Sequence, residues 1–387
     1  MIYKFRDIIE EVEERNTDLR YGLDNIVGVT IEKGLIPTIA NLTQTSLDKF
    51  YLVKPETFVY NPRTHGVRLG MGFNNTTNIY ITSWNNVAFK VSPKAQYIVM
   101  PQYLWLFFCR PIWDRLTNFL AWGSSTIVFA WKDFLDIDID IPSITRQREI
   151  VSEYETLTNR IRLNNQMIQH LEATAQALYR KTFVDNIDKE NLPEGWRMGT
   201  LGEVCEINTE NVSSKNNYKR IDYLDSSSVT ENKFDAYQHL IVGTDEIPSR
   251  AKRKVKTNDI VYSTVRPNLK HYGIIKGDVG DVVVSTAFAV IRSNTPEISN
   301  ELLYLILTDE AVTEILQGIA EMSKATYPSI TPENIMELKV TLPQQMDNDF
   351  SELNKSLRTL FDSIAIIYKE NSKLTELQSL LLAKMGQ

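Results

Sequence analysis

The chain has 387 residues, of which 43% are hydrophobic and 24% are charged, and its formal net charge is -7. This length is too great for one ordinary core and fits two domains with connectors, while the composition excludes disordered, collagen-like and membrane proteins. The acidic balance argues against a simple basic protein that coats DNA, because neutralising phosphates requires lysine and arginine.

The N-terminal residues, MIYKFRDIIEEVEERN, carry charges throughout and predict no signal peptide. The richest apolar stretch, from Tyr103 to Phe108, is too short to cross a bilayer. A cytoplasmic location is therefore expected. The two cysteines, Cys109 and Cys205, lack partners at metal-ligand spacing, which predicts reduced, buried thiols and no metal site.

A first globular domain is expected over residues 1–142. It contains short β-type runs such as NIYIT (78–82), one helix near 102–120, and a last strand in which Ile137, Ile139 and Ile141 alternate with aspartates. Proline 142 ends that strand, as is typical at a sheet edge.

A long spacer helix is predicted over residues 143–186. Its apolar residues alternate by four and three, which is the spacing of a coiled-coil seam. The seam positions are Ile150, Tyr154, Leu157, Ile161, Asn164, Ile168, Leu171, Ala175 and Leu178. A polar linker with proline and glycine, around 186–195, then marks a domain boundary.

A second globular domain is expected over residues 190–343, with a β-type run at 281–292, one helix near 300–319 and a strand that ends at Pro343. A second long helix follows over residues 346–386. Its seam positions are Phe350, Leu353, Leu357, Leu360, Ile364, Ile367, Asn371, Leu374, Gln378 and Leu381. Asn164 and Asn371 are candidates for polar positions that set the register.

The two halves resemble each other. KPETFVY at 54–60 aligns with KTNDIVY at 256–262, and WKDFLDIDIDIP at 131–142 aligns with PENIMELKVTLP at 332–343 at nearly the same offset. We interpret this as a tandem duplication. The predicted fold is α+β, with two mixed domains joined by two long helices in an antiparallel coiled coil and related by a pseudo-twofold repeat.

Basic residues gather in the second domain although the chain is acidic. They begin in the segment 250–256 and continue through Arg266, while acidic residues concentrate elsewhere, notably at Glu10 to Glu14. The candidate DNA-binding residues of the second domain are Arg250, Lys252, Arg253, Lys254, Lys256, Arg266, Asn268, Lys270, His271, Lys324 and Tyr327. Those of the first domain are Thr43, Gln44, Asn61, Arg63, His65, Arg68, Ser124 and Ser125. Any one of these outside the basic cluster is as well explained as a solvated loop residue.

The sequence contains no recognisable catalytic motif. It has no phosphate-binding glycine loop, no His-Glu-x-x-His zinc motif and no Asp/Asn-Pro-Pro-aromatic loop of an adenine methyltransferase. Asp136, Asp138 and Asp140 alternate with isoleucine and so form the polar face of a strand. No catalytic residue is therefore predicted.

Several segments resemble the specificity subunits of type I restriction-modification systems. These are LPEGW (192–196) followed by Leu201-Gly202, YSTVRP (262–267), STAFAVIR (285–292) and ITPENIMELKVTLP (330–343), together with the strand-to-helix junction at 139–151. Residues 1–20 lack the Leu-Pro-x-Gly-Trp opening, and Gln345 to Asn348 lacks the usual Glu-Gln pair.

This resemblance implies that each domain reads one half of a split site on double-stranded DNA and that the helices pack antiparallel as a spacer. It also implies two modification subunits, which bind S-adenosylmethionine, and two restriction subunits, which use ATP and Mg; no cofactor is expected in this chain. A helix of forty residues is about 60 Å long and would set the gap between the half-sites. The alternative is a coiled-coil scaffold that binds proteins and not DNA.

Overall fold

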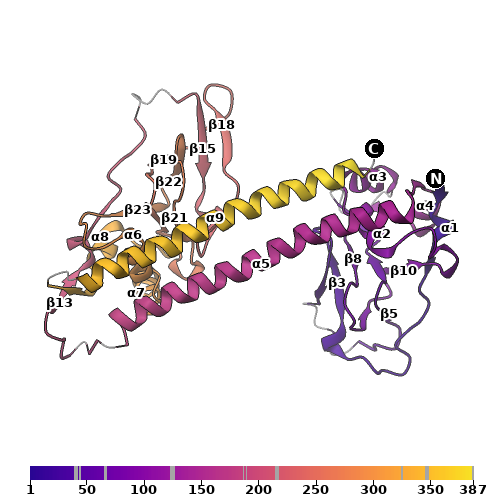
Figure 1. Ribbon diagram of the computed structural model, residues 1–387, viewed down its shortest axis with the longest axis horizontal. Coiled ribbons are helices and arrows are strands. Elements are labelled where there is room, and N and C mark those ends of the chain that lie inside the picture. Colours follow the sequence, from indigo (N-terminus) through magenta and orange to yellow (C-terminus); the bar gives the residue numbers. More distant parts are fainter. Residues whose placement is uncertain are drawn as a thin grey trace. The chain divides into compact units, whose positions relative to one another are not determined.

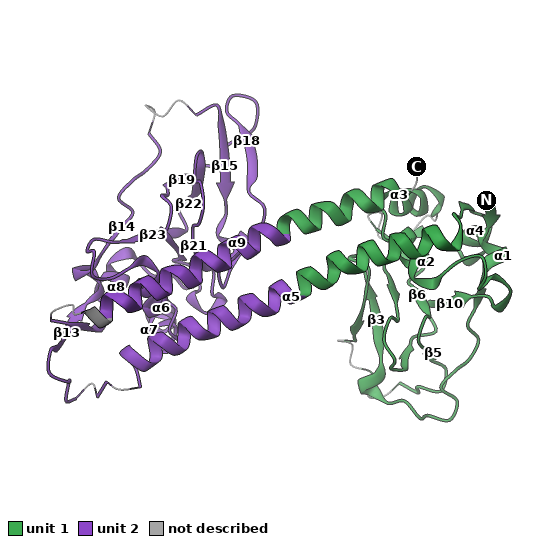
Figure 2. Cartoon of the chain, in the orientation of Figure 1, with its two compact units in different colours: residues 1–162, 372–387 green, residues 163–371 purple. Residues whose placement is uncertain are grey.

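A computed structural model describes residues 1–38, 42, 45–64, 68–122, 127–185, 187–188, 190–213, 218–323, 326–344 and 348–385. The chain forms two compact units (Figure 2). Unit 1 comprises Met1–Arg162 with Ser372–Gln387, and unit 2 comprises Leu163–Asn371. Each unit therefore contains one globular domain and a part of each of two long helices, α5 (Ile144–Phe183) and α9 (Asn348–Lys384), drawn in magenta and yellow in Figure 1.

Unit 1 is built on a four-stranded antiparallel sheet. Its order is β2 (Ile9–Glu11), β10 (Val87–Val91), β6 (Phe58–Tyr60) and β8 (Met71–Phe73). Two helices, α2 (Pro101–Phe108) and α3 (Pro111–Leu120), contribute to the same core, in which aromatic rings of the sheet and the helices contact one another. Phe58, for example, lies 5.0 Å from Phe89 and 5.7 Å from Phe108, measured between ring centroids.

Four short two-stranded pairs complete this domain. They are β1 (Ile2–Lys4) with β12 (Asp138–Asp140), β3 (Val27–Thr30) with β4 (Gly34–Pro37), β5 (Tyr51–Val53) with β9 (Tyr80–Thr82), and β7 (Arg63–Thr64) with β11 (Ile127–Val128). The remaining short helices are α1 (Phe5–Ile8), η1 (Leu23–Asn25), η2 (Pro93–Ala95) and α4 (Trp131–Leu135).

Unit 2 contains a sheet of the same topology. Its order is β14 (Cys205–Ile207), β23 (Phe288–Ser293), β20 (Ile260–Ser263) and β21 (Tyr272–Ile274). In both units the strand that comes first in the chain lies at an edge beside the last, and the second and third follow. Helices α6 (Asn300–Leu307) and α7 (Glu310–Glu321) correspond to α2 and α3. The common topology supports the duplication inferred from the sequence.

The remaining strands of unit 2 differ from those of unit 1. A second four-stranded sheet has the order β18 (Gln238–Ile241), β15 (Arg220–Leu224), β22 (Val282–Ser285) and β19 (Ala251–Lys254), with β15 and β22 parallel. Two pairs are β13 (Trp196–Thr200) with β24 (Lys339–Pro343) and β16 (Val229–Thr230) with β17 (Lys233–Phe234). The short helices are η3 (Leu201–Glu203), η4 (Ser226–Ser228), η5 (Pro267–Leu269) and α8 (Pro332–Met336).

Three local predictions need correction. The single helix expected at 102–120 is two helices, because Pro111 occupies the first turn of α3 and cannot continue α2. The one expected at 300–319 is also two helices, since the Asp309 side chain accepts a hydrogen bond from the Ala311 N–H and caps α7. The run at 281–292 is two strands joined by a turn. In addition, the last strand of each domain is short and follows a helical turn, α4 in the first domain and α8 in the second.

The two long helices run antiparallel within each unit. In unit 2 the Asn164 side-chain NH2 donates to Asn371 Oδ1 at 2.8 Å, and Asn371 donates in turn to Asn165 Oδ1 at 2.9 Å. In unit 1 the Gln378 side chain donates to the Thr158 hydroxyl at 2.7 Å. None of the proposed seam residues is fully exposed, and several, such as Ile150 and Leu357, pack into the domain cores.

The LPEGW segment explains how the second domain joins the helices. Gly195 has a φ of +83°, a left-handed conformation that glycine adopts without strain, and it directs the chain into β13. The Trp196 ring then lies 5.3 Å from Phe183 at the end of α5 and 5.6 Å from Phe350 at the start of α9. This aromatic cluster fixes the ends of both helices to the second domain.

Candidate nucleic-acid interface

The basic segment 250–256 lies mainly on β19, which pairs with β22 at the edge of the second sheet of unit 2. Within the described part of the chain, Arg250, Lys252 and Lys254 have no ion-pair partner. Arg253 donates to Asn211 Oδ1 at 2.9 Å. The outer edge of β19 is itself bonded to residues 210–212, so it is the unpaired side-chain charges that can face an anion such as a phosphate.

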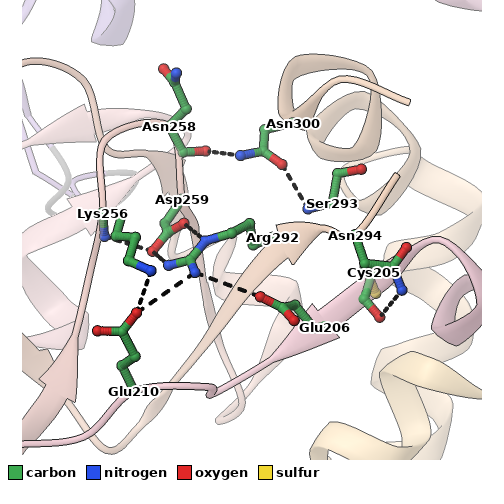
Figure 3. A network of polar contacts seen from close by, with 10 residues as sticks. All are labelled: Cys205, Glu206, Glu210, Lys256, Asn258, Asp259, Arg292, Ser293, Asn294 and Asn300. Carbon is green, nitrogen blue, oxygen red and sulfur yellow. Dashed lines mark hydrogen bonds and ion pairs between the residues drawn. The ribbon is translucent and has the colours of Figure 1, made fainter. Parts of the chain in front are cut away.

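Lys256 belongs to a polar network that joins the turn between β19 and β20 to β14, β23 and α6 (Figure 3). Its ammonium group forms an ion pair with Glu210, and its backbone N–H donates to Asp259 Oδ2 at 2.7 Å. The fully buried Asp259 accepts two further hydrogen bonds of 2.7 Å from the guanidinium of Arg292. These bonds to the carboxylate raise the pKa of Arg292 above its usual value. Lys256 is therefore a structural cation that supports β19 and β20.

A second arm of this network reaches α6. The Asn300 side chain donates to the Asn258 carbonyl at 2.7 Å and accepts from the Ser293 N–H at 2.7 Å, as Figure 3 shows. The turn between β19 and β20 is thereby fixed to the end of β23 and to the first residue of α6. The network thus attaches the end of β19 to the core of the domain, so the exposed side chains of β19 are held by fixed neighbours.

The loop after β20 presents Arg266. This residue has φ 49° and ψ 70°, a left-handed conformation that is costly for an L-residue other than glycine. Its N–H donates to the Pro328 carbonyl at 2.9 Å, and Val265 forms a bridge with Ser329. Its exposed guanidinium lies 5.1 Å from the centroid of the Tyr327 ring, and that ring is 58% exposed. The strained backbone and the cation–π contact hold the guanidinium ready for a partner.

Three other predicted residues lie in the same loop. The Asn268 N–H donates to Gln317 Oε1 at 3.2 Å, and its side chain is exposed. Lys270 is also left-handed and forms an ion pair with Glu310 at 3.0 Å, which raises the pKa of its ammonium group. The His271 ring lies within hydrogen-bond distance of the Val229 carbonyl, at 2.7 Å. Lys270 and His271 thus tie the base of the loop, whereas Arg266 and Asn268 face outward.

Unit 1 presents an exposed arginine in the corresponding loop, with an exposed aromatic residue on the same face. Arg63 on β7 pairs with Val128 on β11, and Val128 forms a bridge with Trp122, which lies two residues after the end of α3. Directly opposed residues of antiparallel strands point to the same face. The exposed Arg63 and the indole of Trp122, which is 68% exposed, therefore lie on one face, separated by Val128. The Asn61 side chain accepts from the Arg63 N–H at 3.0 Å and shapes this turn.

Other predicted residues have no such contacts or cannot be placed. Arg68 is exposed and follows the same loop as Arg63. Thr43, Gln44, His65, Ser124, Ser125 and Lys324 lie outside the described residues. The sequence analysis missed Trp122, an exposed aromatic residue two positions after α3. The repeat does not point to it, because Met322 directly follows α7 and the exposed Tyr327 lies six residues after the end of that helix.

Residues 193–376 match the family described as Type I restriction modification DNA specificity domain. The second domain and most of the second long helix thus carry the sequence pattern of a type I restriction-modification DNA specificity domain. A relative, the type I restriction enzyme HindI specificity subunit of Haemophilus influenzae, is 29% identical over 184 residues, which cover 44% of this chain. The match spans 39% of that relative's length.

The whole chain resembles a solved structure in fold. The S subunit of a type I restriction-modification system from M. genitalium aligns over 99% of this chain and 94% of its own, with a TM-score of 0.59 and 12% identity. At this identity the likeness concerns the fold, including both domains and both long helices. The predicted α+β architecture with two tandem domains and two spacer helices is confirmed.

The described residues of this chain contain no cluster of three or more histidine, cysteine, aspartate or glutamate side chains placed to hold a metal ion. No helix in the described ranges is both long and apolar enough to cross a membrane. Both cysteines are free, and Cys205 is only 2% exposed.

Burial raises the pKa of each cysteine thiol to about 12. At pH 8 the thiolate fraction should then be about 10⁻⁴, and the thiolate is the reactive form. We expect the folded protein to react with Ellman's reagent only very slowly, and both thiols to react at once after unfolding in guanidinium chloride. Rapid modification of the folded chain at pH 8 would contradict the burial of these groups.

Proposed function

We propose that this chain is the DNA-reading subunit of a type I restriction-modification complex and is non-catalytic by itself. Each domain reads one half of a split target in double-stranded DNA, and the paired helices set the gap between the halves and dock two modification subunits. Two restriction subunits would complete the complex in the cytoplasm. Methyl transfer, ATP hydrolysis and cleavage belong to these partner subunits in this proposal.

One observation carries this proposal: the two domains share one core topology, and each presents an exposed arginine just after the corresponding strand, β6 or β20, with an exposed aromatic residue in the segment that pairs with that loop. In unit 2 the pair is Arg266 and Tyr327, and in unit 1 it is Arg63 and Trp122. Arginine pairs bidentately with guanine in the major groove, and aromatic rings pack against bases or sugars. The strands outside the common four-stranded sheet differ between the two domains. This difference suits an asymmetric target, because each half would be read by different loops.

The basic residues divide into two groups under this proposal. Those that would contact phosphates are the unpaired Arg250, Lys252 and Lys254 on the edge strand β19, and the exposed Arg68. Arg253, Lys256 and Lys270 are bonded within the domain and would support the contact residues. The net charge of -7 need not prevent DNA binding, since the cations gather on one strand and its neighbouring loop.

Salt titration tests the proposal against a protein-binding scaffold. Binding of cognate duplex by the complex with its modification subunits should weaken by about 10³-fold between 50 and 200 mM salt, because phosphate contacts release counterions. A duplex of scrambled sequence should bind far more weakly at each salt concentration. Binding that does not change with salt, or no binding, would favour the scaffold. Mapping methylated adenines in cells that carry the complex should give a split motif with a constant gap.

A further inference from the structure

A buried glutamine fixes the start of the first long helix to the first domain. Gln147, in the first turn of α5, is fully buried. Its side-chain oxygen accepts a hydrogen bond from the Met100 N–H at 2.8 Å, and its NH2 donates to the carbonyls of Ile98 at 2.8 Å and Pro142 at 2.9 Å. Both ends of the amide are satisfied, so the side chain allows one orientation of the helix relative to α2.

A buried asparagine does the same for the second long helix. Asn354 on α9 is 6% exposed. Its oxygen accepts from the Ser299 N–H at 2.9 Å, and its NH2 donates to the Glu297 carbonyl at 2.7 Å. Asn354 therefore makes the same pair of bonds to unit 2 that Gln147 makes to unit 1.

The two contacts match because their partners occupy equivalent places. Met100 is the N-cap residue of α2 and Ser299 is the N-cap residue of α6, and in each unit the carbonyl that accepts belongs to the residue two positions earlier. An unpaired amide or carbonyl in this buried position would cost about 1–3 kcal/mol. The pattern is retained although the residue type differs and the second junction lacks a Glu-Gln pair.

We propose that Gln147 and Asn354 are positioning residues, which fix the direction in which each long helix leaves its domain and thereby the gap between the two half-sites. This inference rests on the proposed function. A helix of forty residues is about 60 Å long, so a tilt of about 3° at its base moves its far end by about 3 Å perpendicular to the helix axis, a distance close to the rise of one base pair. Loss of an oriented amide at the base is therefore expected to relax the placement of the reading domains and with it the range of gaps that is accepted.

The test measures how strongly each complex prefers the native gap between the half-sites, and not only how tightly it binds. The complex of the full chain with its modification subunits is prepared with Gln147→Leu, with Asn354→Leu and with Gln169→Leu as a control, since Gln169 is exposed on the same helix as Gln147. Affinity is measured for duplexes with the native gap and with one base pair added or removed. The wild type and the control should prefer the native gap at least tenfold, because each added or removed base pair also rotates one half-site by about 34°. In both variants this preference should fall below about threefold.

An unchanged preference in Gln147→Leu and Asn354→Leu, even with weaker binding to every duplex, would overturn the inference, because a merely structural role lowers all affinities together. If the leucine variants do not fold, Gln147→Glu and Asn354→Asp replace them: each carboxylate keeps the acceptor and loses the donor, and the same loss of gap preference is expected. A wild-type complex that binds no DNA would overturn the proposed function itself. If the wild type and the variants all bind DNA and prefer the native gap equally strongly, only this inference is overturned.

Discussion

Replacement of Arg266 by alanine should weaken binding to one half of the DNA target by about 10- to 100-fold, which corresponds to the loss of one arginine contact worth about 1–3 kcal/mol. The contact should be strong because the loop holds the guanidinium in place before DNA arrives, through its left-handed backbone and the Tyr327 ring. Affinity is measured by fluorescence anisotropy on duplexes in which one half-site or the other is scrambled.

Arg63 provides the matched experiment, because it occupies the equivalent loop of the first domain. Arg63→Ala should weaken the opposite half-site, and the double variant should show both losses. Arg148→Ala is the control, since Arg148 is exposed on α5 away from both loops. Equal loss at both half-sites from either single variant would contradict the assignment of one half-site to each domain.

Asp259→Ala should destabilise the second domain by about 3–5 kcal/mol, as is typical when one partner of a buried ion pair is removed. Asp259 is fully buried, bonds Arg292 through both oxygens and accepts the Lys256 N–H. Its loss leaves the amide without a partner and leaves the guanidinium with only Glu206 and Glu210, at 3.6 and 3.9 Å. The free energy of unfolding is measured by urea denaturation, followed by circular dichroism.

Asp235→Ala is the control for this measurement, because Asp235 is an exposed aspartate of the same unit. Combining Asp259→Ala with Arg292→Met should recover part of the lost stability, since it removes the unpaired charge as well. A change of less than about 1 kcal/mol in Asp259→Ala would mean that the network does not support the domain.

The architecture was predictable from local patterns. The spacing of apolar residues by four and three predicted both long helices to within three residues of their observed ends, 144–183 and 348–384. The match of KPETFVY with KTNDIVY correctly paired β6 with β20 across the duplication. These features are visible in sequence because helix periodicity and repeated segments depend on residues that are close together in the chain.

The roles of individual polar residues were not predictable in this way. Lys256 was predicted to contact DNA, and only the fold shows that it also bonds Glu210. Arg63 and Trp122 share one face only because β7, β11 and a residue two positions after α3 pair in one register. Nothing in the sequence equates Gln147 with Asn354, since their positions after the terminal strand and their residue types both differ.

The sequence alone thus determined the order of the elements, the duplication and the two helices, since short-range periodicity encodes them. Only the tertiary structure decided which cations are free, which aromatic residue stands beside each arginine, and which amide orients each helix. The physical reason is that a hydrogen bond or an ion pair forms between whichever groups the folded backbone brings within about 3 Å, and the partners are tens of residues apart in the chain.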